Sequence, residues 1–472
     1  MTMQEHSSHT SIPKQVVILG GGLAGLALAT ELVGKFAEVI LLEKKTHLGG
    51  RASNTFDRKT HDPVPIGPHI FMTAYNNFRR FLKKIQAEHA VTWEKKVLLE
   101  VIHEGIHHQF RHSRIRHPFY MAPWLLRYPF LTWSDKLSNI RFGWELITNS
   151  ASKFEALDDV SAAVYLSKKG VSRRSIDMFW RFLAMSMLNV PIEKCSAAEF
   201  CLLFKHWSQF EHRKIGFAKK GLGDIYTKHA REFIEARGGS IKHGSLVRQL
   251  RVRDGKTHIT VEREGTRETL IPDICISTLN PVELTTVLEP ELLRNSFFKP
   301  IQAFEGVPYI SVNLWFDDKI THKQFWALVN APGLTHYINT DFYDQSNIYE
   351  TRKHKSFITS NIIYSKEDEQ MTDGEIVSKT LSELREVFPH MTAQLTHSHV
   401  HRIPYVVYAP YPGMRKHKRS HVTPVESLYL AGDWTAPETQ CMEAAVRSGY
   451  RCAEAVLRAH GIEKKICDER TL

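Results

Sequence analysis

The 472-residue sequence predicts an α/β fold in which one domain is assembled from separated parts of the chain and an α+β second domain is inserted between them. Two patterns predict the first domain. A strand, glycine turn, helix and strand occupy residues 16–43, and a second strand–loop–helix pattern occupies residues 427–449. Between them, segments in which apolar and polar residues alternate are typical of strands and predict the mixed sheet of the second domain. A run of helices rich in aromatic residues predicts its helical subdomain.

The glycine turn has the spacing of a dinucleotide-binding site. It follows a short apolar run of the kind that a buried parallel strand shows, and it reads Gly20-x-Gly22-x-x-Gly25. Gly20 allows the tight turn, Gly22 lets the backbone approach a pyrophosphate, and Gly25 lets the helix lie close to the strand. Leu23 and Ala24 begin that helix, whose free N–H groups and dipole favour phosphate. The pattern therefore predicts a Rossmann-like domain.

The second strand adds an acid and a further glycine pair. It ends in Glu43, eighteen residues after Gly25, where a carboxylate accepts hydrogen bonds from a ribose diol and disfavours a 2′-phosphate. We include the adjacent Lys44 in the predicted cofactor site. Gly50 lets the backbone pass close to a cofactor, and Arg51 can bridge to its diphosphate. This second element favours FAD over other dinucleotides.

Charge and cysteine content limit the partners. The net charge of +11 is compatible with nucleic acid, an anionic membrane or plain solubility. Its basic residues are scattered and no nucleic-acid motif accompanies them, so we expect no nucleic acid and favour a membrane surface, with solubility as the alternative. Six cysteines form no C-x-x-C pair and no metal spacing, so we expect reduced thiols and no metal. We expect a cytoplasmic protein associated peripherally with a membrane.

A third segment carries a resemblance to a known family. Gly67-Pro68-His69-Ile-Phe is followed by Tyr75-x-Asn77 and a helix. With the glutamate and Gly-Gly-Arg above, it resembles the FAD-dependent phytoene and ζ-carotene desaturases and hydroxysqualene dehydroxylases of the flavin-containing amine oxidase superfamily. The resemblance covers residues 14–460 and implies that Gly67, Pro68 and His69 line the isoalloxazine.

The resemblance also assigns residues in the second half of the chain. It implies that the backbone of Val247 faces the adenine and that Gly432 and Asp433 lie at the flavin, where Asp433 can hold a ribityl hydroxyl. The helix that begins at Met442 and includes Ala445 can point its dipole at the pyrimidine edge of the ring. Because no typical covalent attachment signature is present, we expect non-covalent FAD.

These motifs divide the chain. We expect the FAD-binding domain to be formed by residues 14–90, 216–285 and 421–460. We expect the substrate domain to be formed by residues 91–215, which include the membrane-facing part, and 286–420. The ends of the chain are expected to be a disordered tail at 1–13 and a frayed tail at 461–472. Residues 118–133, crowded with aromatics and broken by proline, are either a buried lid or an element lying at a membrane surface; the resemblance favours the second. No uninterrupted apolar window of about 18 residues exists.

The resemblance implies an FAD-dependent oxidoreductase acting on a polyprenyl isoprenoid lipid, by carotenoid-type desaturation or squalene-type dehydroxylation with hydride transfer. The alternative is an amine oxidase or protoporphyrinogen-oxidase-like enzyme on the same fold. Two departures count against an amine: residues 306–318 contain no lysine, the nearest being Lys299 and Lys319, and Cys441 stands where amine oxidases carry a tyrosine. The sequence names no catalytic side chain.

Overall fold

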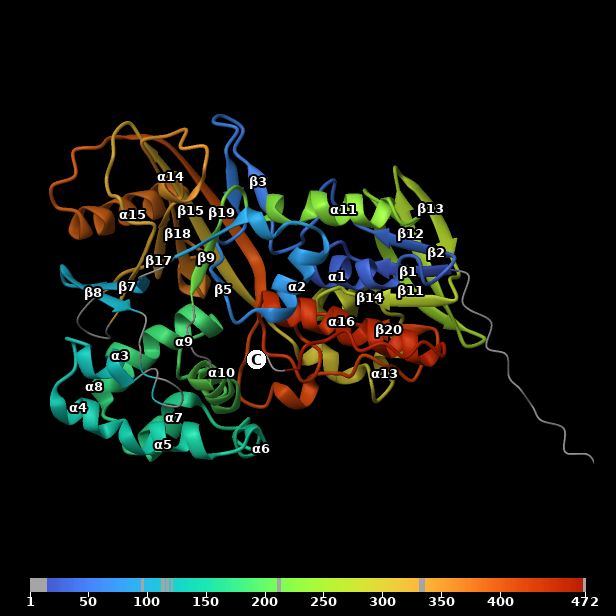
Figure 1. Ribbon diagram of the computed structural model, residues 1–472, viewed down its shortest axis with the longest axis horizontal. Coiled ribbons are helices and arrows are strands. Elements are labelled where there is room, and N and C mark those ends of the chain that lie inside the picture. Colours follow the sequence, from blue (N-terminus) through green and yellow to red (C-terminus); the bar gives the residue numbers. More distant parts are fainter. Residues whose placement is uncertain are drawn as a thin grey trace, which may run out of the picture.

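The computed structural model describes residues 15–94, 97–111, 115, 119, 122–209, 214–330 and 336–469. The tail predicted at 1–13 lies outside the described residues. A parallel sheet with its helices occupies one half of the molecule, and a larger sheet with a block of helices occupies the other half (Figure 1). The α/β fold, with a second domain built on a mixed sheet, is confirmed.

The first half is organised by a five-stranded parallel sheet. The order of its strands in space is β10 (Ser240–Lys242), β2 (Glu38–Leu42), β1 (Gln15–Leu19), β14 (Ile274–Ser277) and β20 (Leu428–Leu430). These strands come from three distant stretches of the chain, and every neighbouring pair is parallel. The carboxyl ends of β1 and β2 therefore lie side by side, which brings the glycine turn next to the strand that ends before Glu43.

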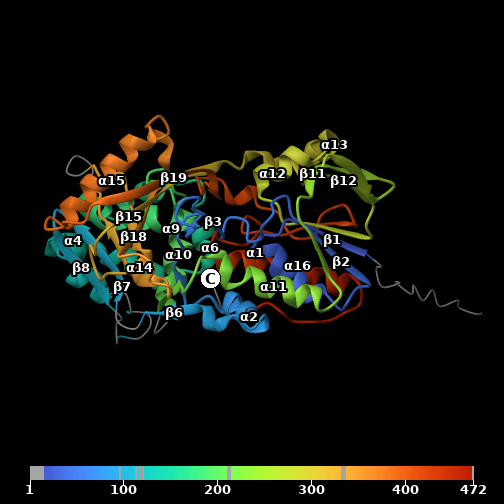
Figure 2. The same cartoon turned by 90° about the horizontal axis from the view of Figure 1, so that it is seen from above.

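Alternate residues of β1 pack into two different cores. Val16 and Ile18 join one cluster and Val17 and Leu19 join another, as the two-residue period of a strand requires. The first face is covered by α1 (Leu23–Leu32), α2 (Asn76–Lys84), α11 (Thr227–Glu235) and α16 (Met442–Ala459). The second is covered by the antiparallel strands β11 (Leu246–Arg253), β12 (Lys256–Arg263) and β13 (Thr266–Leu270), with α12 (Pro281–Val287) and α13 (Pro290–Arg294), as Figure 2 shows.

The second half contains a mixed seven-stranded sheet. The order of its strands is β19 (Leu395–Tyr408), β15 (Gly306–Phe316), β18 (Ser356–Ile363), β17 (Asp341–Asp344), β16 (Phe325–Leu328), β7 (Val97–His103) and β8 (Ile106–Arg111). Its pairs are antiparallel except β16 with β7. One face packs against α15 (Asp373–Val387), through residues such as Val312 and Ile376. The opposite face, which carries Tyr309 and Tyr343, belongs to the core shared with the helical block.

The helical block lies against that second face. It contains α3 (Ala122–Arg127), α4 (Trp133–Ser138), α5 (Ile140–Thr148), α6 (Ala151–Glu155), α7 (Ala162–Lys168), α8 (Arg173–Ser175), α9 (Arg181–Leu188) and α10 (Ala197–Gln209). A π-helical turn, Ile176–Trp180, joins α8 to α9 without a break in the helix. Buried aromatic rings such as Phe142, Trp180 and Phe200 fill the block.

Short elements connect the two halves. β5 (Phe71–Met72) and β6 (Val91–Trp93) both pair with β9 (Ile215–Ala218), and β3 (Asn54–Phe56) pairs with β4 (Pro63–Pro65). A short helix, α14 (Gln345–Ile348), follows β17. Among the described residues, none of the helices has both the length and the apolar character needed to cross a bilayer.

The prediction of a frayed end is wrong for residues 463–469. Ile466 and Cys467 are buried, and the carboxylate of Glu454 accepts a hydrogen bond from the backbone N–H of Cys467 at 2.8 Å. The backbone N–H of Asp468 donates to Asn77 Oδ1 at 2.8 Å. This segment holds because two apolar side chains fill the space beside α16 and α2, despite the charged residues around them.

The segment at 118–133 divides between core and surface. Trp124 and Phe130 are buried, and Trp124 Nε1 donates to the carbonyl of Arg111 at 2.9 Å. Leu126 and Trp133 are exposed. Residues 118, 120 and 121 lie outside the described residues. A surface role for the whole segment is therefore wrong for Trp124 and Phe130, whose rings pack against aromatic neighbours such as Phe110 and Tyr128.

Candidate functional site

One elongated cavity of about 800 Å³ passes from the glycine turn into the helical block. All of the predicted site residues except Gly25 line it: Gly20, Gly22, Leu23, Ala24, Glu43, Lys44, Gly50, Arg51, Gly67, Pro68, His69, Val247, Gly432, Asp433, Met442 and Ala445. The chain thus gathers motifs more than 400 residues apart around a single space. We call the part lined by the glycine turn the nucleotide end, and the part lined by the helical block and the mixed sheet the substrate end.

Two glycines leave a slot at the nucleotide end. A Cβ built on Gly22 would meet only the Cα of Gly50, at 4.0 Å, so this face of Gly22 is open. Gly50 has a φ of +59°, and a Cβ there would lie 3.2 Å from the Cα of Gly22. The two backbones pass each other closely and leave space that side chains would fill. Within the described part of the chain, no side chain caps the N-terminus of α1, which leaves backbone N–H groups there for a phosphate.

Gly25 supports the turn from behind. A Cβ on Gly25 would lie 2.1 Å from the carbonyl oxygen of Gly20, a contact that no side chain tolerates. This agrees with the predicted reason for the third glycine, which is close packing of helix on strand. Gly25 therefore acts in the motif through packing and does not line the cavity.

Glu43 is already engaged by the chain. One carboxylate oxygen, Oε2, accepts from the backbone N–H of Gly21 at 2.8 Å, and the other, Oε1, accepts from the N–H of Lys45 at 2.8 Å. The side chain therefore fixes the glycine turn and also borders the cavity. Each oxygen keeps a second lone pair, so a ribose diol could still donate to it. Next to it, Lys44 forms an ion pair with Glu283.

Arg51 and Asp433 meet in the middle of the cavity. The guanidinium donates from one nitrogen to Asp433 Oδ1 at 2.8 Å and from another to the carbonyl of Val406 at 2.8 Å. Burial alone would lower the pKa of Arg51, but the adjacent Asp433 and Tyr405 raise it, so the guanidinium stays charged. Arg51 and Asp433, which were predicted to contact different parts of the cofactor, hold each other in this structure and bring the first and last motifs together.

The segment 67–69 lines the same cavity. His69 Nδ1 donates to the carbonyl of Gly67 at 2.7 Å. Burial and the positive charge of Arg51 lower the pKa of His69, which favours a neutral ring. The ring of Tyr309 lies against Gly67, because a Cβ there would be 3.7 Å from Tyr309 Cε1. The segment thus lies beside the mixed sheet that lines the substrate end.

The C-terminal motif closes the opposite wall. The backbone N–H of Gly432 donates to Ser448 Oγ at 2.7 Å, which ties the end of β20 to α16. Cys441 caps α16 by accepting from the N–H of Ala444 at 3.3 Å. The first turn of α16, with Met442 and Ala445, faces the cavity. Met442 and Ala445 therefore lie where the sequence motif predicted them, at the start of a long helix directed toward the cavity.

The substrate end combines an apolar lining with a polar group on the mixed sheet and with further polar residues such as Ser186 and His206 on the helical block. Its apolar lining includes Trp124, Phe179, Phe182, Leu183, Met187, Leu203 and Trp207. The polar group, Tyr309, Asp341 and Tyr343, comes from β15 and β17 and was missed by the sequence analysis. Residues 339–344 read Asn-Thr-Asp-Phe-Tyr-Asp, with no alternation or motif that would mark Asp341 or Tyr343 as site residues.

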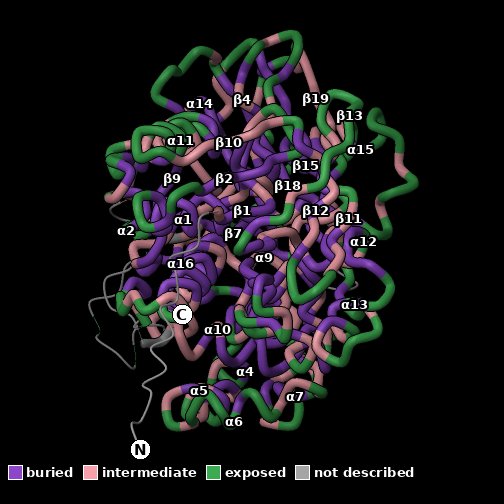
Figure 3. Tube along the Cα trace, turned by 90° about the vertical axis from the view of Figure 1, so that its right-hand side faces the viewer, coloured by how far each residue is buried: buried purple, intermediate pink, exposed green. Residues whose placement is uncertain are grey.

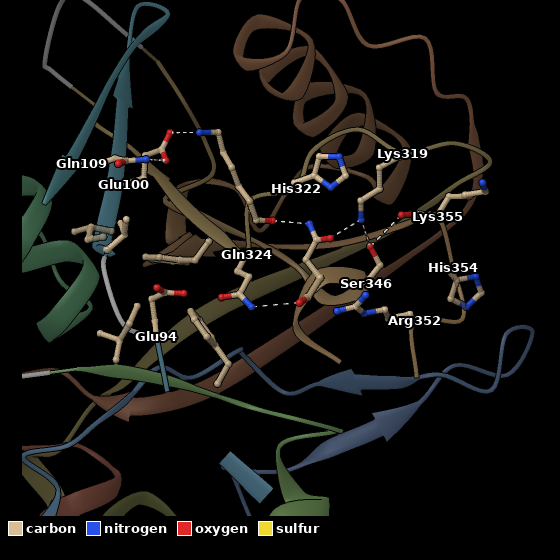
Figure 4. A pocket seen from close by; sticks show the side chains of 17 residues that line it. Glu94, Glu100, Gln109, Lys319, His322, Gln324, Ser346, Arg352, His354 and Lys355 are labelled. Atoms are coloured by element: carbon tan, nitrogen blue, oxygen red, sulfur yellow. Dashed lines mark hydrogen bonds and ion pairs between the residues drawn. The ribbon is translucent and has the colours of Figure 1, made fainter. Parts of the chain in front are cut away.

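Lys319, one of the two lysines nearest to the strand at 306–316, is held outside the main cavity. Lys319 Nζ donates to Ser346 Oγ at 2.8 Å and to Asn347 Oδ1 at 2.6 Å. Figure 4 shows it directed at these groups, in a second cavity of about 670 Å³. Of the described residues that line the main cavity, the lysines are Lys44 and Lys45, both at the nucleotide end.

A Rossmann-type sheet, a glycine turn and a matching C-terminal helix around one cavity define a dinucleotide-binding oxidoreductase of the flavin class. The sequence profile of the family described as flavin containing amine oxidoreductase matches residues 23–457, and the chain belongs to this family. It is therefore an FAD-dependent oxidoreductase, as predicted. The open face of Gly22 and the uncapped start of α1 fit the diphosphate of that cofactor.

Curated relatives support the predicted resemblance. The chain is 27% identical to 15-cis-phytoene desaturase of Capsicum annuum, over 94% of this chain and 78% of the relative. It is 26% identical to 15-cis-phytoene desaturase of Synechococcus elongatus, over 94% and 96%, and 24% identical to zeta-carotene desaturase of Arabidopsis thaliana, over 94% and 85%. The resemblance to the phytoene desaturase group within the amine oxidase superfamily is confirmed.

Solved structures share the fold. A putrescine oxidase bound to putrescine superposes with a TM-score of 0.71 at 15% identity, covering 94% of this chain and 99% of that one. An oxidoreductase from Methanosarcina mazei gives 0.69 at 17% identity, covering 94% and 100%. At this level of identity the likeness extends to the fold alone.

Proposed function

We propose that the protein is an FAD-dependent desaturase acting on an isoprenoid hydrocarbon of the carotenoid class. The observation that carries the proposal is the shape and lining of the cavity, which continues from the nucleotide end past segment 67–69 into an aromatic and aliphatic chamber. A long hydrocarbon gains free energy in such a chamber by leaving water, at about 25 cal/mol per Å² of apolar surface. The relatives named as phytoene and zeta-carotene desaturases support the same substrate class.

The predicted cofactor residues take the following roles in this proposal. Gly22 and the start of α1 receive the diphosphate, Glu43 the ribose and Val247 the adenine. Arg51 and Asp433 divide their interactions between each other and the cofactor, at the diphosphate and the ribityl chain. Segment 67–69 and the start of α16 border the ring, which supplies hydride-transfer chemistry when bound. The chain orients the hydrocarbon and excludes water.

A second reaction, removal of a hydroxyl from a squalene-type alcohol, uses the same chamber. The polar group at Tyr309 and Asp341 favours it as the second candidate, because a buried polar cluster can accommodate one oxygen atom. Amine oxidation is disfavoured, since Lys319 is directed away from the main cavity and Cys441 is used as a helix cap.

The test is anaerobic mixing of the purified flavoprotein with 15-cis-phytoene in lipid vesicles. We expect loss of the oxidised-flavin absorbance and formation of a product with an additional double bond, detected by chromatography. Putrescine in the same assay should leave the spectrum unchanged. Reduction by putrescine but not by phytoene would overturn the proposal in favour of an amine oxidase. Inertness with phytoene and conversion of hydroxysqualene would favour dehydroxylation.

We propose also that the protein captures this substrate from a membrane surface, through a face formed by Leu126 and helices α4 and α5. Trp133, Leu137, Ile140 and Trp144 follow each other at intervals of four, three and four residues and are each more than 60% exposed. Trp133 and Leu137 lie four residues apart on α4, and Ile140 and Trp144 four residues apart on α5, so each pair shares one side of its helix. Lys136 Nζ lies 4.9 Å above the Trp133 ring, which adds a positive charge beside the apolar face. Figure 3 shows this edge of the molecule, beside α4 and α5, with much exposed chain.

Vesicle co-sedimentation tests this face. Each large apolar side chain that inserts fully contributes about 1.5–3 kcal/mol, and partial insertion contributes less. The variant Ile140→Ser/Trp144→Ser should remain in solution while the unchanged protein pellets with anionic vesicles. The matched control Ile271→Ser/Val422→Ser changes two exposed apolar residues on the nucleotide half and should pellet normally. Equal pelleting of both variants would overturn this face as the attachment site.

A further inference from the structure

A buried carboxyl group borders the substrate end of the cavity. Asp341 begins β17 and is 6% exposed. Its neighbour in sequence, Phe342, belongs to the core under α15, whereas Tyr343 belongs to the core of the helical block. The two-residue period of the strand therefore places Asp341 and Tyr343 on the same, cavity-facing side.

Two neutral polar groups hold this carboxyl group. Asp341 Oδ1 accepts from Asn361 Nδ2 at 2.6 Å, and its Oδ2 accepts from the hydroxyl of Tyr343 at 3.3 Å. Cross-strand neighbours are Ala327 on β16 and Asn361 on β18. The titratable groups that face it are Tyr309 from β15 and Tyr343 from its own strand. Burial raises the pKa of Asp341 to about 7, and the two hydrogen bonds oppose this only in part.

Its position links it to the flavin-lining wall. Burial raises the pKa of Tyr309 and the negative charge of Asp341 raises it further, so the two groups lie close together. The ring of Tyr309 also packs against Gly67. Gly67, Tyr309 and Asp341 therefore succeed one another along one cavity. A carboxyl group that is half-ionised near neutral pH and open to a hydrocarbon chamber suits proton transfer, because a catalytic pKa near the working pH balances availability and driving force.

We propose that Asp341 is the catalytic proton acceptor of the oxidation. A carbon of the substrate loses a hydride to FAD, and the adjacent carbon loses its proton to the Asp341 carboxylate. The electron pair of the C–H bond that loses its hydride leaves with that hydride. The electron pair of the C–H bond that loses its proton becomes the π bond of the new double bond. The substrate is thereby oxidised, FAD is reduced and Asp341 is protonated. This assignment rests on the desaturation proposed above.

The first experiment follows the carboxyl group without substrate. Infrared spectra of the purified flavoprotein between pH 5 and pH 9 should contain a protonated-carboxyl band that disappears near pH 7. Asp341→Asn should remove that band. Burial also raises the pKa of Glu383 to about 7, but Glu383 lies on α15 and accepts from Asn339, so Glu383→Gln is a matched control that should remove a separate band. A spectrum unchanged by Asp341→Asn would overturn the proposal.

The second experiment measures the flavin reduction itself with phytoene-loaded vesicles in the absence of oxygen. In the unchanged protein and in Glu383→Gln, the rate should rise with pH through about 7, since only the carboxylate accepts a proton. Asp341→Asn should be slower by about 100-fold or more and lack this rise. Its flavin content and thermal transition, measured at pH 4 where the carboxyl group is protonated in both the folded and the unfolded chain, should match the unchanged protein, which separates catalysis from folding.

The outcomes distinguish the two proposals. If phytoene fails to reduce the flavin of the unchanged protein, the desaturase assignment fails, and the infrared titration still decides whether Asp341 ionises near pH 7. If phytoene reduces the flavin and Asp341→Asn retains the rate and its pH dependence, the desaturase assignment stands and the role of Asp341 is overturned.

Discussion

The two ends of the cavity are built by different means. At the nucleotide end, backbone atoms form the surface: Gly22 and Gly50 pass each other, and Glu43 braces the turn through the N–H of Gly21. At the substrate end, side chains form the surface, and the polar ones, such as Tyr309 and Asp341, come from different strands of the mixed sheet. Binding of the common cofactor depends on the absence of side chains, whereas the substrate reaction depends on their identity.

The largest expected effects come from two substitutions in the glycine turn, one of which should abolish cofactor binding and the other folding. Gly22→Val should fold but bind no FAD, because its side chain enters the slot without meeting other protein atoms except near Gly50. Gly25→Ala should instead fail to fold normally, because its Cβ would lie 2.1 Å from the Gly20 carbonyl. Flavin absorbance and thermal unfolding measure the two effects. A Gly22→Val protein with full flavin content would contradict the site.

The next effect concerns the stability of the substrate end. The raised pKa of Asp341 means that the folded protein holds a proton that the unfolded chain has lost, so its contribution to stability falls as pH rises from about 4 to about 7. Above that window, Asp341→Asn should be more stable than the unchanged protein by up to about 4 kcal/mol. At pH 4 this difference should vanish. Urea unfolding of both proteins at pH 4 and pH 8, with excess FAD, measures this difference in stability. An equal difference at the two pH values would contradict the raised pKa of Asp341.

A smaller effect is expected at Glu43. Glu43→Ala removes the acceptor for Gly21 and the predicted acceptor for the ribose. It should weaken FAD binding by about 1.5–3 kcal/mol, the range for hydrogen bonds to a charged group. Equilibrium titration of the apoprotein with FAD gives the value. As a control, Glu283→Ala removes the partner of Lys44 at the rim of the same cavity and should have less effect. An equal loss in both variants would mean that general charge, and not this carboxylate, matters.

The smallest effect is expected at Lys319. Its ammonium group is held by Ser346 and Asn347 in the second cavity, so Lys319→Met should change the rate of flavin reduction by less than about twofold, within the range of a surface ion pair. Stopped-flow reduction by phytoene measures it. A loss of about 100-fold, typical of removing a catalytic proton-transfer group, would instead place this lysine in the reaction.

The sequence by itself determined the nucleotide end. A glycine turn, an acid at the end of the next strand and a helix start are local features, and their spacing fixes where Gly20, Gly22 and Glu43 lie relative to one another. It also predicted a helix that begins at Met442, and α16 begins at that residue.

Only the tertiary structure decided the substrate end. Trp124 and Trp133 look alike in sequence, yet one is buried and the other exposed, because the packing of α3 against β8 and α10 selects between them. Asp341 is unremarkable in sequence. Its burial and its raised pKa arise when β15, β17 and β18 pair across stretches of chain that no local pattern relates. A carboxyl group acquires such properties from its surroundings, and those surroundings exist only in the folded protein.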